Sequence, residues 1–314
     1  MTAIRLDPTL LLSAAFALGA IVGSFLNVCI YRIPRKRENQ VELGIPEAEV
    51  LPEGHSIVAP RSFCPGCRSP IPWFDNVPIL SYAVLNGRCR GCEARIPFRY
   101  PFVEFLTGAL FALCAWNFRQ DPAMALVAML VSATLVVMTF IDLDFRIIPD
   151  GISLGGTAVA VVLSALMPSL HVKAWPALAA SAAPVSSRGE ALLCALIGAV
   201  VGAGSIYAMH FLGLGYLKVK SRLKGIPWEP GQEVVGGGDL KLMAAVGALM
   251  GWQAAVLVFF IAPVFGAAVG AVRMLVSEDP YIAYGPFLAV AAFLVMLWRG
   301  EILDWFASGL ARGA

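Results

Sequence analysis

The chain has 314 residues, of which 59% are hydrophobic and 14% charged, and its mean hydropathy is +0.77. A soluble domain needs more surface charge than this, so the composition excludes an ordinary soluble protein and predicts an integral membrane protein. The formal net charge of only +2 predicts no nucleic-acid partner.

Seven segments are almost free of charge, and most approach the roughly 20 residues that cross a bilayer. They are 10–30, 105–118, 122–141, 151–167, 191–213, 240–275 and 282–298. The segment 240–275 is too long for one straight helix, so it forms either a hairpin that turns near Gly251 or one kinked helix. The hairpin is favoured because Arg273 lies beside a turn. The predicted fold class is therefore an all-α polytopic membrane protein with about eight transmembrane helices.

Basic residues are concentrated in alternate connections between these segments. Ten Lys and Arg lie in 32–100, and five more lie in 214–241. Because cytoplasmic loops carry an excess of Lys and Arg, both stretches are expected on the cytoplasmic side. The stretch 214–238 is predicted to be a basic loop. The connection 168–190 is rich in Pro, Ala and Ser and is expected to be a flexible external loop.

Small residues recur four positions apart inside the apolar segments. Such pairs let helix backbones approach closely in lipid, so they predict helix packing and carry no catalytic meaning. The pairs are Gly19 with Gly23, Gly198 with Gly202, and Gly266 with Gly270.

Four cysteines form two CxxC motifs, Cys64-Pro-Gly-Cys67 and Cys89-Arg-Gly-Cys92, with 21 residues between them. Each motif aims two thiolates at one point, and two motifs complete a tetrahedral metal site. The predicted cytoplasmic location disfavours disulfides. One structural zinc ion per chain is the favoured interpretation, and redox-active thiols or an iron–sulfur site are the alternatives. The other cysteines, Cys29, Cys114 and Cys194, lie in apolar segments and are expected to be inert.

These features predict three parts of the chain. Residues 1–31 form the first transmembrane helix, and residues 32–100 form a small cytoplasmic zinc-knuckle domain. Residues 101–314 form a membrane-embedded domain. The zinc would compensate for the few core residues of the 32–100 segment.

Two acidic residues at the edges of apolar segments are the candidate catalytic groups, because carboxylates beside a membrane helix are costly. Asp142 ends the third segment, and Asp239 follows Gly236-Gly237-Gly238 at the start of a later one. The topology places both at the cytoplasmic surface. Two close carboxylates retain one proton between them. One can then activate water while the other protonates a peptide carbonyl, which predicts proteolysis.

Neighbouring charged residues have simpler interpretations. Asp144 is expected to be either an interfacial acid or an acid that supports the catalytic pair. Asp150, after Pro149, is expected to cap the next helix, with a catalytic role as the alternative. Lys241 is expected to contact lipid headgroups, with an influence on Asp239 as the alternative. For Asp142 itself, an ion pair with Arg146 at i, i+4 is the competing interpretation.

Taken together, the motifs resemble the prepilin peptidase family, the type IV prepilin leader peptidase/N-methyltransferases. The segment Gly23–Val28 resembles the family's N-terminal signature. The resemblance continues through the cysteine motifs with their flanks, including Arg99-Tyr-Pro-Phe-Val-Glu104. It also covers Asp142 to Asp150, the glycine-Asp239-Lys241 segment and Tyr284-Gly285-Pro286-Phe287.

The resemblance implies a GxGD aspartate protease of the bacterial inner membrane, with Asp142 and Asp239 as the catalytic pair at the cytoplasmic face. It implies type IV prepilins and type II secretion pseudopilins as substrates. It also implies N-methylation of the new N-terminus with S-adenosylmethionine. The chain departs from the family pattern in two small ways. Gly237 stands where a larger residue is common in the family, and the 168–190 loop looks longer than usual.

No Rossmann-type glycine fingerprint follows a strand in this sequence, so an S-adenosylmethionine site must be unorthodox. We expect it between the Gly23–Val28 segment and the zinc subdomain. Competing hypotheses for the whole chain are a GxGD signal-peptide peptidase of another lineage, a cation transporter and a scaffold of a secretion machinery. The double CxxC domain argues against a signal-peptide peptidase of another lineage. The expected position of the acids near the membrane surface argues against a cation transporter.

Overall fold

The computed structural model describes residues 7–36, 39, 43–52, 55–171, 185–224, 235–276 and 283–313. Across these ranges the regular structure is helical, with eight helices of 14 residues or more and no strand beyond two isolated β-bridges. Within the described part of the chain, five helices are long and apolar enough to cross a membrane. The protein is therefore a helical multi-pass membrane protein, as predicted.

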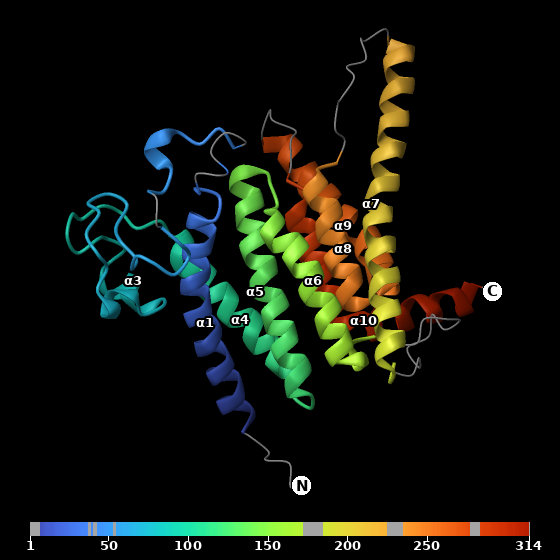
Figure 1. The fold of residues 1–314 in the computed structure, drawn as a ribbon, viewed down its shortest axis with the longest axis horizontal. Coiled ribbons are helices and arrows are strands. Elements are labelled where there is room, and N and C mark those ends of the chain that lie inside the picture. Colours follow the sequence, from blue (N-terminus) through green and yellow to red (C-terminus); the bar gives the residue numbers. More distant parts are fainter. Residues whose placement is uncertain are drawn as a thin grey trace. The chain divides into compact units, whose positions relative to one another are not determined.

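The chain divides into two compact units, residues 1–145 and 146–314, and each is described by itself (Figure 1). Unit 1 contains three long helices. Asp7 precedes the first helix and caps it, because its carboxylate accepts a hydrogen bond from the Thr9 amide at 2.7 Å. The helices are α1 (Pro8–Arg32), α4 (Arg99–Asn117) and α5 (Pro122–Phe145).

Helices α1 and α4 pack backbone to backbone. A methyl group added at Gly19 would lie 2.6 Å from the Thr107 carbonyl, and one added at Gly23 would lie 2.7 Å from Cα of Glu104. The four-residue glycine spacing therefore does bring two helices together, which confirms this packing prediction for α1.

The segment that connects α1 to α4 has little regular structure. Its short helices are η2 (Glu47–Glu49), η3 (Trp73–Asn76) and α3 (Leu80–Val84). We call residues 55–98 the cysteine segment. Arg32, buried at the end of α1, donates hydrogen bonds to the carbonyls of Ser56 (2.6 Å) and Pro60 (2.9 Å). These bonds attach the cysteine segment to α1.

Unit 2 contains five long helices. Helices α7 and α8 lie side by side, because Gly198 and Gly202 let α7 contact the carbonyls of Gly247 and Met243 directly. Helix α7 extends well past its neighbours (Figure 1) and continues to Lys224, so the prediction of a loop from residue 214 is wrong over its first part. The helices are α6 (Asp150–Leu166), α7 (Arg188–Lys224), α8 (Gly237–Met250), α9 (Trp252–Val276) and α10 (Gly285–Gly313).

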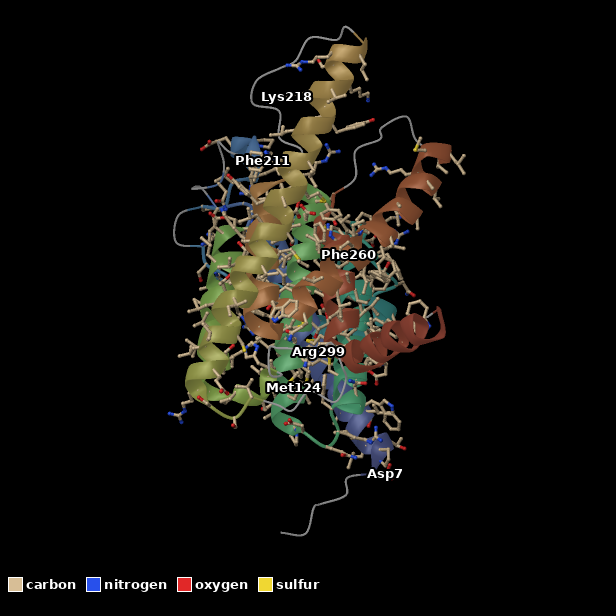
Figure 2. All side chains as sticks on the ribbon, turned by 90° about the vertical axis from the view of Figure 1, so that its right-hand side faces the viewer. Asp7, Met124, Phe211, Lys218, Phe260 and Arg299 are labelled. Atoms are coloured by element: carbon tan, nitrogen blue, oxygen red, sulfur yellow. The ribbon has the colours of Figure 1, made fainter. Side chains whose placement is uncertain are left out.

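The surface of unit 2 carries large apolar side chains, as expected of helices that face lipid. Phe211 on α7 and Phe260 on α9 project from their helices (Figure 2), with 53% and 66% of their surfaces exposed. Helix α10 has a kink, because the backbone at Trp298 departs from helical geometry (φ −127°, ψ 25°).

The long apolar segment 240–275 forms two helices that meet at Gly251. This glycine has φ +86°, a conformation that ends α8 and that other residues rarely adopt. Arg299 on α10 donates a hydrogen bond to the carbonyl of Met250 (3.0 Å) and fixes the end of α8. The prediction of a break near Gly251 is confirmed, and the single kinked helix is wrong.

The predicted external loop 168–190 is described only in part. Pro168–Leu170 form the short helix η4. The Nε2 atom of buried His171 lies 2.8 Å from the hydroxyl oxygen of Ser164. The amide of Val185 donates to the carbonyl of His171 (3.0 Å), so the two described ends of this loop meet. Residues 172–184 lie outside the described residues.

Candidate active site and cysteine cluster

Asp142 lies in the last turn of α5, in unit 1. Its side chain is buried, with 6% of the residue exposed, beside the fully buried Ile141. Burying a carboxylate this far at a helix end is costly, which makes the residue a candidate for function. Its place at the end of this helix agrees with the sequence, and its catalytic role stays a prediction.

Asp144, two residues further on, is bound by Arg99 from the start of α4. The Nη1 atom of Arg99 lies 2.6 and 2.8 Å from the two Asp144 oxygens, and Nη2 donates to the Phe140 carbonyl at 3.1 Å. The guanidinium also lies over the Phe140 ring, 4.7 Å from its centre. Arg99 therefore fixes the end of α5 that carries Asp142, and its positive charge suits a helix C-terminus.

Asp239 lies in the first turn of α8, in unit 2. The helix starts after Gly236, whose carbonyl accepts the Asp239 amide at 3.1 Å. The residue is 9% exposed. The partial positive charge of the helix N-terminus favours an ionised carboxylate at this position. The structure thus places each predicted acid at a helix end, one in each unit.

The three glycines before Asp239 have different surroundings. A Cβ at Gly238 would lie 2.9 Å from Cβ of Ile148, whereas a Cβ at Gly237 would meet nothing within 4 Å. Only Gly238 is therefore needed for close packing, here against the segment that leads into α6. The open space at Gly237 also explains why a larger residue would fit there.

Lys241 and Asp150 connect α8 to α6. Lys241 Nζ lies 2.5 Å from Asp150 Oδ1. The prediction that Asp150 caps α6 is wrong, because the cap position is Pro149 and no side chain caps the helix. Lys241, expected to contact lipid headgroups, is instead half-buried in this ion pair. The pair helps to position the helix start that carries Asp239.

Tyr284, just before α10, has a buried hydroxyl without a hydrogen-bond partner in the described part of the chain. Burial and the nearby charge of Asp239 raise the pKa of Tyr284 to about 12, so its hydroxyl stays protonated and can donate a hydrogen bond. The sequence reasoning assigned this residue no role. The signal available was its place in the Tyr284-Gly285-Pro286-Phe287 motif.

The four cysteines of the two CxxC motifs come together as predicted. All four Sγ atoms lie within 4.8 Å of one another, and none is in a disulfide. Cys64 Sγ and Cys92 Sγ are 3.8 Å apart, close to the roughly 3.8 Å edge of a tetrahedron with Zn–S bonds of about 2.3 Å. The arrangement could therefore hold a metal ion such as zinc.

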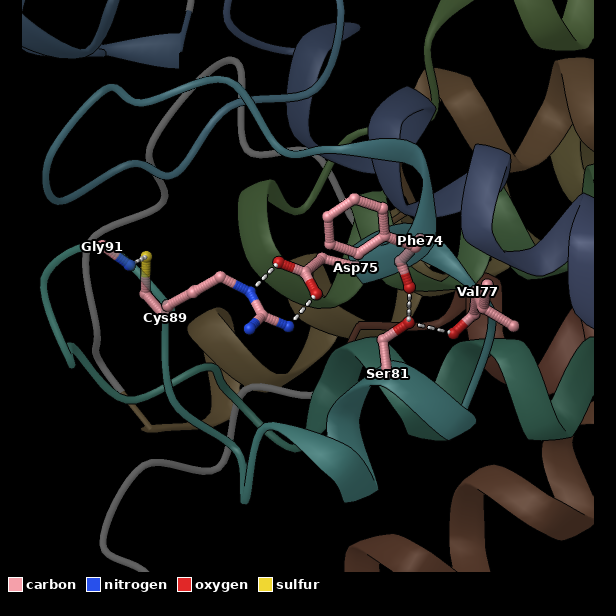
Figure 3. Close-up of polar contacts among 7 residues, drawn as sticks. Phe74, Asp75, Val77, Ser81, Cys89 and Gly91 are labelled. Carbon is pink, nitrogen blue, oxygen red and sulfur yellow. Dashed lines mark hydrogen bonds and ion pairs between the residues drawn. The ribbon is translucent and has the colours of Figure 1, made fainter.

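The local structure acts differently on the four thiols: two are shifted toward the thiolate, whereas the pKa of Cys92 is raised to about 12, because the Ala94 amide, which lowers it, is outweighed by the neighbouring Cys67 and by burial. Each motif is followed by a residue with positive φ, Arg68 (58°) and Glu93 (56°), which turns the chain back on itself. Hydrogen bonds to Ser69 lower the pKa of the Cys67 thiol to about 6. The Gly91 amide, which donates to Cys89 Sγ at 3.4 Å (Figure 3), lowers the pKa of Cys89. Thiolates are the form that binds zinc.

A cavity of about 550 Å³ lies within unit 1, between α1, α4 and the cysteine segment. Figure 3 shows polar contacts among residues in and beside its lining. Arg90 donates to both oxygens of Asp75 at 2.7 Å, and this pairing lowers the pKa of the Asp75 carboxyl. The hydroxyl of Ser81 donates to the carbonyls of Phe74 and Val77. The Arg90 bonds connect the second cysteine motif to η3, and the Ser81 bonds connect η3 to α3.

Glu104 on α4 lines this cavity and is 9% exposed. Its Oε2 accepts the amide of Ile79 at 2.7 Å. Asn27 on α1 donates to the Tyr100 carbonyl at 3.1 Å, which joins the two helices beside it. The sequence reasoning did not single out Glu104. The cost of a carboxylate within an apolar helix, the same signal that identified Asp142, would have found it.

The fold and these sites define a helical multi-pass membrane protein with an N-terminal Cys₄ unit and buried aspartates at two helix ends. Two family models match the chain. The model of the bacterial peptidase A24 N-terminal domain matches residues 17–118, and that of the type IV leader peptidase family matches residues 129–271.

Curated relatives named "Prepilin leader peptidase/N-methyltransferase" are similar over most of the chain. The protein of Aeromonas salmonicida (strain A449) is 35% identical over 311 residues, covering 96% of this chain and 95% of the relative. That of Pseudomonas putida is 32% identical, with the same coverage of each. That of Burkholderia pseudomallei (strain 1026b) is 38% identical, over 88% of this chain and 82% of the relative. No solved structure matches. The chain belongs to the type IV leader peptidase family.

Proposed function

We propose that this protein removes the leader peptide from type IV prepilins and type II secretion pseudopilins and then N-methylates the new N-terminal residue. The observation that carries the proposal is the similarity, at 31–38% identity over 88% or more of this chain, to relatives named for both activities. The buried aspartates at the ends of α5 and α8 supply chemistry suited to the first activity.

Asp142 and Asp239 are the proposed catalytic pair. The reaction requires the two carboxylates to share one proton between them. The ionised carboxylate takes a proton from water, and the oxygen of that water attacks the carbonyl carbon of the scissile peptide. The protonated carboxyl donates to the carbonyl oxygen. When the tetrahedral intermediate collapses, the C–N bond breaks and a proton goes to the departing amine.

The proposed location is the bacterial inner membrane, with the catalytic side in the cytoplasm. The excess of Lys and Arg in 32–100 and 214–241 supports this orientation. It places the cysteine segment in a reducing compartment, which suits four thiolates around a structural zinc ion rather than disulfides.

Methyl transfer needs a methyl donor, and the family resemblance implies S-adenosylmethionine. When bound, this compound supplies a methyl group on a positively charged sulfur. The groups present in unit 1 fit such a molecule, because a cavity of about 550 Å³ there is lined by tyrosine rings and by the buried carboxylate of Glu104. The three parts 1–31, 32–100 and 101–314 remain a prediction for how the two activities are divided along the chain.

One experiment tests both activities together. Purified full-length protein is incubated with a prepilin, with and without S-adenosylmethionine, and the mass of the product is measured. We expect loss of the leader in both reactions and the added mass of one methyl group only in the second. An uncleaved prepilin would overturn the proposed peptidase, and a cleaved but unmethylated product would overturn the proposed methyl transfer.

A further inference from the structure

One part of the cysteine segment has the composition of a segment that contacts lipid. Across residues 71–87, which include η3 and α3, the only charged residue is Asp75, and its carboxylate is paired with Arg90. Large apolar side chains of this part are exposed, four of them at spacings of four, three and four residues. We call the exposed set the apolar patch, and it consists of Trp73, Phe74, Val77, Leu80, Val84 and Phe98. An exposed apolar surface of this kind marks a site of interaction.

We propose that the apolar patch lies in the bilayer, at the boundary between headgroups and acyl chains in the leaflet beside the cysteine segment. In the proposed orientation this is the cytoplasmic leaflet. The partner is therefore a lipid surface, and the inference depends on neither of the two proposed activities.

The depth of α3 along the membrane helices supports this placement. Residues 8–31 carry no charge, so α1 crosses the bilayer before it reaches Arg32. Gly23 lies nine residues before Arg32, which is about 13 Å along the helix axis. A Cβ at Gly23 would lie 2.7 Å from Cα of Glu104, so Glu104 is at the same depth. The Glu104 carboxylate accepts the Ile79 amide at 2.7 Å, and α3 therefore starts beside α1 and α4 rather than beyond their ends (Figure 1).

The backbone around α3 has its hydrogen bonds satisfied within the protein, as a chain beside lipid requires. The amides of Ser81, Ala83 and Leu85 donate to backbone carbonyls at 2.9–3.2 Å. The amide of Ile79, at the turn before α3, donates to the Glu104 carboxylate. Glu104 therefore supplies the acceptor that a turn at this depth needs.

The apolar patch continues onto the exposed side of α4. The ring centre of Phe98 lies 6.3 Å from that of Tyr82 in α3 and 6.5 Å from that of Phe102 in α4. Phe102 and Phe105 are both exposed on α4. Because α4 packs backbone to backbone along α1, these phenylalanines face lipid, and the same lipid covers the adjoining patch.

The charges next to the apolar patch suit phospholipid headgroups. Residues 88–99 contain four arginines and one acid, Glu93. Arg88 and Arg95 are exposed, and their backbones pair in an isolated β-bridge. Basic side chains near a membrane surface are attracted to anionic headgroups, and rings such as that of Trp73 are enriched at the same level. An apolar surface with a basic margin is the pattern of a segment that lies in the interface.

Photo-cross-linking from single positions of the full-length protein tests the lipid contact. The photoreactive residue p-benzoylphenylalanine replaces Leu80, or Val58 as the control, and the protein is placed in nanodiscs of phosphatidylethanolamine and phosphatidylglycerol. The two positions are 65% and 79% exposed. Val58 lies between two residues whose carbonyls bind Arg32 at the end of α1, so it lies outside the depth of α3. We expect the added mass of a phospholipid on peptides from the Leu80 variant and not on those from the Val58 variant.

Other cross-linking results would contradict the proposal. A cross-link from position 80 to a second copy of the chain, or to prepilin when prepilin is added, would show that protein covers the patch. Equal lipid adducts at both positions would show unselective capture. No lipid adduct at either position would show that the patch faces water.

A charge placed in the apolar patch gives an independent result. Leu80→Asp puts a carboxylate among acyl chains, where it is costly, whereas Val58→Asp puts one in water. When the patch leaves the bilayer, Arg88 and Arg95 become accessible to trypsin. We expect trypsin to cut the cysteine segment of Leu80→Asp in nanodiscs at least tenfold faster than that of wild type, and that of Val58→Asp at the wild-type rate. The uncharged Leu80→Asn should lie between them. Equal rates for the two Asp variants would overturn the proposal, and the cross-linking result stands even if Leu80→Asp fails to fold.

Discussion

The cysteine segment and helix α8 are stabilised in different ways. Of the 44 residues of the cysteine segment, only Cys64, Ser81 and Gly87 are buried. In α8, eight of 14 residues are buried, among them fully buried Met243 and Ala248. The helix is held by close packing, whereas the cysteine segment has almost no apolar core. The segment must therefore depend on its four thiols and on the bonds from Arg32 and Arg90.

This comparison predicts that changes at the helix ends affect chemistry, whereas changes at the cysteines affect folding. A buried aspartate contributes little to helix packing, so its replacement should leave the helices intact. The cysteines of the cluster stabilise a segment that has almost no apolar core, so replacing one should destabilise the fold of that segment. The experiments below separate the two effects.

The largest effect is expected at the proposed catalytic acids. Asp142→Asn and Asp239→Asn each keep the size of the side chain but can neither accept nor relay a proton. We expect leader removal to fall on the order of 10³-fold or more, with unchanged helix content and zinc content. Gel or mass analysis of a prepilin measures the loss. Near-normal processing by either variant would remove that residue from the mechanism.

The second effect concerns the metal. Metal analysis of the purified protein should find about one zinc per chain, and Cys64→Ser with Cys67→Ser should abolish it. Structural zinc commonly supplies on the order of 10 kcal/mol to the folding of a small unit. Limited proteolysis should then cut the cysteine segment while the helices stay intact by circular dichroism. Cys194→Ala, in α7, is the control and should keep its zinc. Iron with visible absorbance in place of zinc would contradict the assignment.

Much of this fold could be predicted from the sequence, because its causes are local. Long apolar runs require helices in a bilayer, and CxxC spacing brings thiols together whatever the rest of the chain does. Asp142 and Asp239 were identified because a carboxylate beside an apolar run is costly at any position. These signals depend on a few neighbouring residues.

The parts that sequence reasoning missed depend on contacts between distant residues. Lys241 pairs with Asp150, 91 positions away, so neither the expected helix cap nor the expected lipid contact occurs. Arg99 reaches Asp144 from 45 positions away. The amide of Ile79 donates to the Glu104 carboxylate from 25 positions away, a contact that no local pattern encodes. Local patterns therefore gave the helices and candidate residues, but not the contacts that position them.

A smaller effect is expected at the glycines before Asp239, which offer a matched pair. Gly238→Ala would push a methyl group against Ile148, where a Cβ would lie 2.9 Å from its Cβ. Overpacking of this kind costs about 1–3 kcal/mol, and here it should also displace Asp239 and reduce cleavage. Gly237→Ala enters open space and should be neutral or slightly stabilising. Thermal unfolding and prepilin cleavage measure both, and equal effects at the two positions would contradict the packing at Gly238.

The smallest effect is expected at the Lys241–Asp150 ion pair. Lys241 Nζ and Asp150 Oδ1 are 2.5 Å apart, but the side chains are 33% and 62% exposed, so solvent screens much of their attraction. Such pairs contribute about 0–1 kcal/mol. A double-mutant cycle with Lys241→Gln and Asp150→Asn, measured by thermal unfolding, should give a coupling energy in this range. Since the pair joins α6 to the start of α8, cleavage should fall a few-fold in each single variant and no further in the double variant. A double variant with additive losses would show that the two residues act separately, and that Lys241 influences Asp239 without Asp150.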